Sequence, residues 1–146
     1  MTFTIKRQPK KSIHKSMQFA VFFDDPYTPD EVYPNAINLQ TNVTPYQLEN
    51  CELQLNFELQ VIARAQELSA KNLVHPAPIK RECWFNVNFG HQFRGEDVLK
   101  LNATEMSMNL SPEQIAECEA AVKHHLKTVE LAKLLSARGN VLVEVA

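Results

Sequence analysis

Residues 51–61 alternate strictly between apolar and polar side chains, and this pattern constrains the fold more than any other in the chain. The odd positions from Cys51 to Val61 are apolar, and the even positions between them hold Glu, Gln or Asn. Successive side chains of a strand point to opposite faces, so the pattern predicts a long strand with one apolar and one polar face. A sheet that is polar on one side is typical of antiparallel pairing.

A helix over the same residues is the competing interpretation. Apolar residues also recur there at helical spacing, and the preceding segment 44–47 can form a capping box with a proline in the first turn. A helix, however, would leave Leu53, Phe57 and Val61 on the side opposite that stripe. We therefore favour the strand.

Shorter segments predict the remaining extended elements. Alternating or continuously apolar runs predict strands, which cover residues 3–7, 17–23, 36–40 and 83–89. Residues 24–34 are rich in proline and predict a loop, residues 67–78 predict a connection, and residues 99–110 predict an interrupted strand or a strand and a loop.

A long helix is predicted near the C-terminus. Ser111 can cap it, Pro112 suits its first position, and Gln114 can return a hydrogen bond to the cap. Apolar residues at helical spacing continue towards Gly139, which fits the left-handed position after a helix end. The helix would span about 27 residues, or roughly 40 Å, which suits packing across a whole sheet or against a second subunit. Residues 141–145 then predict a short closing strand or an extended tail.

Together these elements predict an α+β fold in a single domain over residues 1–146. We expect an antiparallel four-stranded sheet, with the long C-terminal helix packed on one side of it or at a subunit interface. The length of 146 residues suits one domain, and a hydrophobic share of 45% is ample for one core. Some apolar surface would be left over for a partner.

Composition excludes several classes of function. The chain has three glycines, too few and too scattered for a phosphate-binding loop. Its longest apolar run, residues 19–23, is far short of the roughly 18 residues of a membrane span, and no signal peptide is evident. We therefore expect a cytoplasmic protein that does not insert into a membrane. The net charge of −2 gives no drive towards nucleic acid, and the basic residues near the N-terminus are expected to form a solvated strand edge.

The residues that most often carry chemistry do not form a recognisable site. His124 and His125 are adjacent on the predicted helix and point in different directions, and Cys118 lies two turns before His125. Asp24 and Asp25 precede a proline and predict an Asx turn rather than an acid–base pair. The three cysteines are widely spaced and are expected to be buried thiols. We expect no metal and no cofactor.

The order and spacing of several segments resemble the SecB family of export chaperones. The likeness covers most of the chain, and it is carried by residues 1–7, 14–19, 34–41, 51–61 and 83–89, by Glu117-Cys118, and by the helix-ending Ser136-Ala137-Arg138-Gly139. The resemblance implies a homotetramer, assembled as a dimer of dimers, that holds unfolded or nascent polypeptides in apolar grooves and catalyses no reaction.

Aromatic and methionine side chains suit such grooves, because they adapt to varied apolar clients. The client-binding candidates are Phe19, Phe22, Phe23, Tyr27, Trp84, Met106, Met108 and Leu110. The positions that match the family's acidic contacts to the export motor SecA hold the uncharged Ser16 and Ala20, which counts against SecA as a partner.

Two other functions stay open at this point. The first is a SecB-like chaperone dedicated to one client, such as an antitoxin, and the uncharged positions favour it somewhat. The second is a small inhibitor or adaptor, of the kind encoded by phages or mobile elements, that binds one folded host protein.

Overall fold

The computed structural model describes residues 16–25, 27–89 and 95–145, with side chains as far as Arg138. In chain order its elements are β1 (Ser16–Phe22), the short 3-10 helix η1 (Pro29–Glu31), α2 (Val32–Asn42), α3 (Pro45–Ala70), β2 (Glu82–Asn88), α4 (Glu96–Asn109) and α5 (Pro112–Val145). Helices make up most of these residues, and across the described ranges the strands form a single antiparallel pair. The predicted α+β fold with a four-stranded sheet is therefore wrong.

The helix α3 occupies the segment that the alternation assigned to a long strand. The side-chain oxygen of Thr44 accepts a hydrogen bond from the backbone N–H of Gln47 at 3.1 Å, and the Gln47 side chain accepts from the Thr44 N–H at 3.0 Å. This capping box, with proline in the first turn, begins a helix of 26 residues. The capping box therefore predicts this element correctly, whereas the alternation of residues 51–61 does not.

Helical geometry also explains how α3 accommodates apolar residues on more than one side. Leu48, Cys51 and Leu55 are fully buried on one stripe, and Val61 and Ala65 are buried on a neighbouring one. The helix contacts α5, α4 and β2, so it needs a broad apolar surface rather than a narrow one. Leu53 is 69% exposed and points away from all of them.

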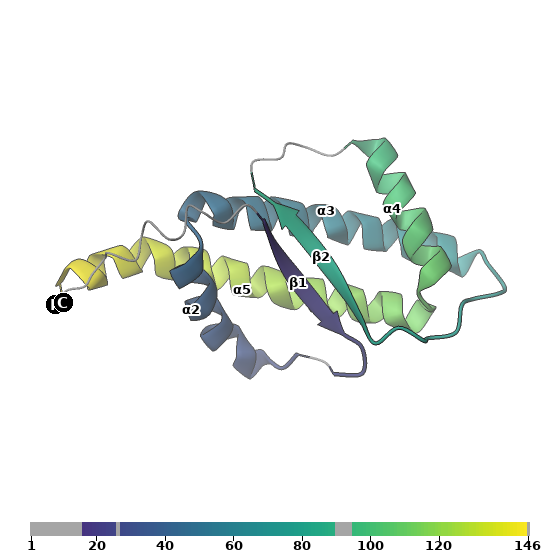
Figure 1. Cartoon of the computed structure of the whole chain (residues 1–146), viewed down its shortest axis with the longest axis horizontal. Coiled ribbons are helices and arrows are strands. Elements are labelled where there is room, and N and C mark those ends of the chain that lie inside the picture. Colours follow the sequence, from purple (N-terminus) through teal and green to yellow (C-terminus); the bar gives the residue numbers. More distant parts are fainter. Residues whose placement is uncertain (1–15, 26, 90–94, 146) are drawn as a thin grey trace.

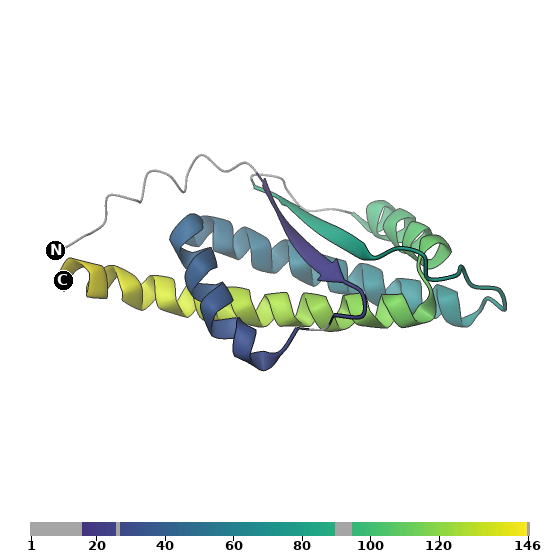
Figure 2. The same ribbon diagram turned by 60° about the horizontal axis from the view of Figure 1, so that its bottom comes forward.

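The two long helices α3 and α5 run antiparallel, side by side, and form the body of the molecule (Figure 1). Helix α2 crosses α5, and α4 packs on α3. The antiparallel pair β1–β2 joins segments that are far apart in sequence, and it lies across one face of the two long helices, with β1 against α5 and β2 against α3 (Figure 2).

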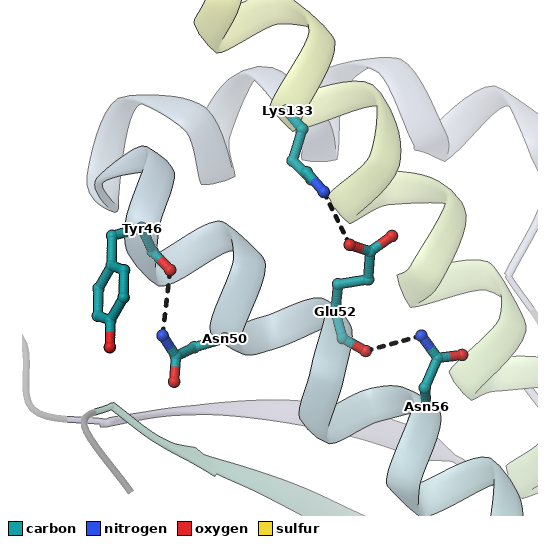
Figure 3. A network of polar contacts seen from close by, with 5 residues as sticks. All are labelled: Tyr46, Asn50, Glu52, Asn56 and Lys133. Atoms are coloured by element: carbon teal, nitrogen blue, oxygen red, sulfur yellow. Dashed lines mark hydrogen bonds and ion pairs between the residues drawn. The ribbon is translucent and has the colours of Figure 1, made fainter. Parts of the chain in front are cut away.

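A polar network joins α3 to α5 at the end nearer α2 (Figure 3). The Lys133 ammonium of α5 donates to the Glu52 carboxylate of α3 at 2.7 Å, and this contact raises the pKa of Lys133. On α3 itself, Asn50 donates to the carbonyl of Tyr46 and Asn56 to that of Glu52. Glu52 is one of the polar residues of the alternating run, so its polarity marks a helix contact rather than a sheet face.

The sheet confirms the strands predicted at residues 17–23 and 83–89, each shifted by one residue. Phe19 pairs with Phe85, and both are buried against the helices. Phe22 and Trp84 lie on the opposite face and are exposed. After β1, Asp24 adopts a φ of 68°, and its N–H donates to the Glu117 carboxylate of α5 at 2.8 Å.

Three further predicted strands are corrected or untested. Residues 36–40 lie in α2, where Ala36 and Leu39 are buried three residues apart, as one helix face requires. Residues 99–110 belong mainly to α4, whose Leu99, Ala103 and Ser107 are buried four residues apart. The strand predicted at residues 3–7 lies outside the described residues.

The C-terminal helix begins as predicted but does not end as predicted. The Gln114 N–H donates to the Ser111 hydroxyl at 3.2 Å, and the Ser111 N–H donates to the Gln114 side chain at 3.3 Å. However, α5 continues through Gly139 to Val145, so the closing strand or extended tail predicted at residues 141–145 is wrong. A glycine inside a helix costs only about 1 kcal/mol relative to alanine, and no proline follows it to end the helix.

Candidate functional site

A groove with a volume of about 600 Å³ lies between β2, α3 and α4. The strand supplies Trp84 and Phe85, the helix α4 supplies Met106, and Leu110 follows that helix. Consecutive residues of β2 line the groove, although their side chains point to opposite faces of the sheet. The groove therefore follows the edge of β2 and not one of its faces.

That edge of β2 has no strand partner in the described part of the chain, because β2 pairs only with β1. A strand edge presents a row of backbone N–H and C=O groups, which can pair with another extended chain. The edge is also held firmly. The Gln54 side chain of α3 both donates to and accepts from the backbone of Asn88, at 2.9 and 3.1 Å.

The polar lining of the groove combines amides with carboxylates. Its amides come from β2 and α4, and its exposed charged groups are two carboxylates against one ammonium: Glu82, Glu105 and Lys80. The Gln114 side chain donates to the carbonyl of Lys80 at 3.0 Å, which ties the start of β2 to α5. The excess of carboxylates predicts a preference for cationic ligands.

Trp84 is the most prominent aromatic surface of the groove. The side chain is 44% exposed, its indole N–H donates to the Glu82 carboxylate at 2.9 Å, and its ring meets that of Phe22 edge-on at 6.0 Å. These two contacts hold the indole in one orientation without burying it. An oriented, half-exposed tryptophan is typical of a binding surface.

The structure brings together four of the eight client-binding candidates. Trp84, Met106 and Leu110 line the groove, and Phe22 contacts Trp84 from the neighbouring strand. Sequence reasoning missed the polar members of the groove. A signal for those on β2 was present, since Glu82 and Asn86 alternate with the buried positions of that strand.

The other four candidates lie elsewhere. Phe19 and Phe23 are buried in the hydrophobic core, and Met108 is exposed on α4 but does not line the groove. Tyr27 packs on α5, where its ring stacks on His124 with centroids 4.4 Å apart.

Of the two adjacent histidines of α5, His125 bonds to the backbone of β1 and His124 stacks on Tyr27. His125 donates from Nε2 to the carbonyl of Ala20 at 2.8 Å, and the Tyr27 hydroxyl donates to the same carbonyl at 2.9 Å. Burial lowers the pKa of both His124 and His125. Nε2 of His124 is buried and has no hydrogen-bond partner among the described residues. The cluster therefore favours neutral imidazole rings.

The three cysteines are free thiols. Cys51 and Cys118 are buried and Cys83 is half-buried. Burial raises the pKa of Cys51 to about 12. A hydrogen bond between Cys118 and Cys83 raises the pKa of Cys118 and lowers that of Cys83. Among the residues whose positions the structure gives, no three His, Cys, Asp or Glu side chains are grouped as a metal site requires.

Comparison of the chain with protein-family models, curated proteins and solved structures gives no match. In the part of the chain that the structure describes, no helix is both long and apolar enough to cross a membrane.

Proposed function

We propose that this protein binds polypeptides, and that it holds an extended, non-native client segment along the free edge of β2. The observation that carries the proposal is the course of the groove, which follows the edge of β2 that faces α4 and has no strand partner in the described ranges. Backbone pairing with a strand edge gives affinity for any extended chain, and side-chain pockets beside the edge give preference.

The lining of the groove matches what an extended segment offers. Trp84 and Met106 provide adaptable apolar contacts for a client side chain. Asn86 and Asn102 can exchange hydrogen bonds with client amides, and Glu105 favours a nearby Lys or Arg. The preferred client is therefore apolar and basic.

The holdase activity expected from the sequence would then be carried out by one groove. SecB membership stays a prediction, since residues 36–40 and 51–61, which helped to carry the resemblance, are helical. Assembly into a homotetramer and a cytoplasmic location are also proposals. The uncharged Ser16 and Ala20 continue to count against SecA as a partner.

A chaperone dedicated to one client, such as an antitoxin, is the second candidate. The groove volume of about 600 Å³ is within the range of sites that take one small ligand, so it suits a short segment. A panel of unrelated unfolded proteins separates the two. A general holdase delays the aggregation of most of them, whereas a dedicated one acts on very few. An adaptor for one folded partner would act on none.

We also propose that the protein is a binder and not an enzyme. Among the described residues, Ser69 and His75 form a hydroxyl–imidazole pair, whose Oγ and Nδ1 atoms are 3.5 Å apart. That distance is at the limit for a hydrogen bond, and the adjoining cavity is lined by Gln66, Pro112 and Ile115 with no carboxylate to orient the ring.

The test is an aggregation assay with a chemically unfolded client, run with wild type, with Trp84→Ser and with Leu53→Ser. We expect wild type to delay aggregation and Trp84→Ser to lose client affinity about tenfold or more, with a change in unfolding free energy of about 1 kcal/mol or less. Leu53 is exposed outside the groove, so Leu53→Ser should behave as wild type. Wild type that neither delays aggregation nor binds an unfolded peptide would refute the proposal.

A further inference from the structure

Residues 71–81, which connect α3 to β2, expose apolar side chains that have no role in the function proposed above. Leu73 is 99% exposed, Val74 85% and Ile79 84%. The connection forms the tip at one end of the molecule (Figures 1 and 2). Single exposed apolar residues are ordinary, but three in one short connection indicate an interaction surface.

The same connection is basic and extended. It contains Lys71, Lys80 and Arg81 and no Asp or Glu. Pro76 and Pro78 restrict their neighbours to extended conformations, so less entropy is lost when the segment binds. An apolar, basic and extended segment has the properties that the β2 groove prefers.

We propose that the apolar part of this connection, residues 73–79 of a second copy of this chain, occupies the β2 groove, an inference that rests on the proposed function of the groove. Lys80 and Arg81 stay on their own copy, where their carbonyls accept hydrogen bonds from Gln114 and Phe23. The connection ends where β2 begins, so the segment and the groove lie at the same end of the molecule. Two copies related by a two-fold axis can then each insert the segment into the other's groove. The contact forms twice, which doubles the buried area of a modest interface.

Charge favours a second copy over an anionic lipid surface as the occupant. With the three cations of the connection set aside, the chain has twelve Lys and Arg against seventeen Asp and Glu. An anionic surface would repel that excess of carboxylates, whereas the groove supplies Glu82 and Glu105 next to the apolar Trp84.

Light scattering over a range of protein concentrations tests the dimer. We expect wild type to dimerise, and expect both L73S/V74S in the segment and Glu105→Lys in the groove to raise the dissociation constant about tenfold or more. Both sites are exposed, and Glu105 lies on the surface of α4, so the variants should fold. Leu53→Ser is the matched control at an exposed leucine outside both surfaces.

Mixing the two variants gives the sharper result. L73S/V74S keeps an intact groove and Glu105→Lys keeps an intact segment, so their heterodimer has one complete contact while each homodimer has none. We expect the mixture to contain dimers at concentrations where each variant alone is monomeric. A monomeric wild type, or a dimer that L73S/V74S leaves unchanged, would overturn the proposal.

A labelled peptide with the sequence of residues 71–81 separates this inference from the proposed function. It should bind L73S/V74S, whose groove is empty, and bind Glu105→Lys about tenfold more weakly or worse. If an unfolded client binds and this peptide does not, the dimer is refuted and client binding stands. If wild type sediments with phosphatidylserine vesicles through the connection and stays monomeric, the dimer is again refuted.

Discussion

At the scale of single residues, His125 makes the stability of the protein depend on pH. Its partner, the carbonyl of Ala20, can only accept a hydrogen bond, so the neutral ring carries its proton on Nε2. Burial lowers the pKa of His125 below 6.5, and the nearby His124 lowers it further, although the Ala20 bond opposes both. Burial also lowers the pKa of His124, with Glu31 opposing and Lys127 adding to that shift.

We therefore predict that the protein loses stability as the pH falls below 6.5. Above that value both rings are neutral whether the chain is folded or not, and their full contribution is present. Below it the unfolded chain takes up protons before the folded chain does. The free energy of unfolding therefore falls with the pH until the folded pKa is passed, and the two rings cause no further change below that point. Urea unfolding at several pH values measures the slope.

Substitution shows whether these two histidines are responsible for that slope. Replacing both with Gln should lower the stability at neutral pH and remove most of the slope between pH 6.5 and the folded pKa. His75, which is exposed, is the matched control, and His75→Gln should keep the wild-type slope. An unchanged slope in the double variant would show that other groups determine the dependence.

At the scale of elements, α3 gives a direct test of helix against strand. In a strand, Leu53 and Leu55 would share one buried face, whereas in α3 Leu53 is exposed and Leu55 is fully buried. We predict that Leu53→Asp changes the unfolding free energy by about 0.5 kcal/mol or less. Leu55→Asp should cost more than about 4 kcal/mol, because it buries an unpaired charge. Equal losses in the two variants would contradict the helix.

The same element shows how much of the fold could be predicted. The capping boxes at Thr44 and Ser111 are local signals, and both begin helices in the structure. The alternation of residues 51–61 is also local, but its meaning depends on the neighbours. Glu52 meets Lys133 of α5 and Gln54 meets the backbone of β2, partners distant in sequence. A periodicity cannot reveal such partners, and so it favoured the wrong element.

For the candidate site, the sequence predicted which types of residue line the groove better than it predicted where each of them lies in the fold. Trp84 and Met106 were singled out because they are adaptable apolar groups, and both line the groove. Phe19 and Phe23 fit the same description but are buried, because odd and even positions of β1 and its following turn face different surroundings. The edge of β2 could not be foreseen, since its lack of a strand partner among the described residues follows from the strands expected at residues 36–40, 51–61 and 99–110 being mainly helical.

At the scale of the whole molecule, the small sheet is held on the helical body by side chains that bond to its backbone. Helix α5 reaches β1 through His125 and the start of β2 through Gln114, and α3 reaches the far end of β2 through Gln54. A two-stranded sheet is marginal by itself, so these attachments and the buried Phe19 and Phe85 keep it in place. The groove depends on them, because β2 is one of its walls.

Removing one attachment should therefore impair binding without unfolding the helices. We predict that Gln54→Ala speeds amide hydrogen exchange in β2 and weakens client binding severalfold, while the helical circular dichroism stays unchanged. Asn56→Ala, on the same helix, removes a hydrogen bond within α3 alone and is the matched control. Faster exchange in β2 with unchanged client affinity would mean that the client does not need an ordered strand edge, and binding would then have to rest on the side chains of Trp84 and Met106.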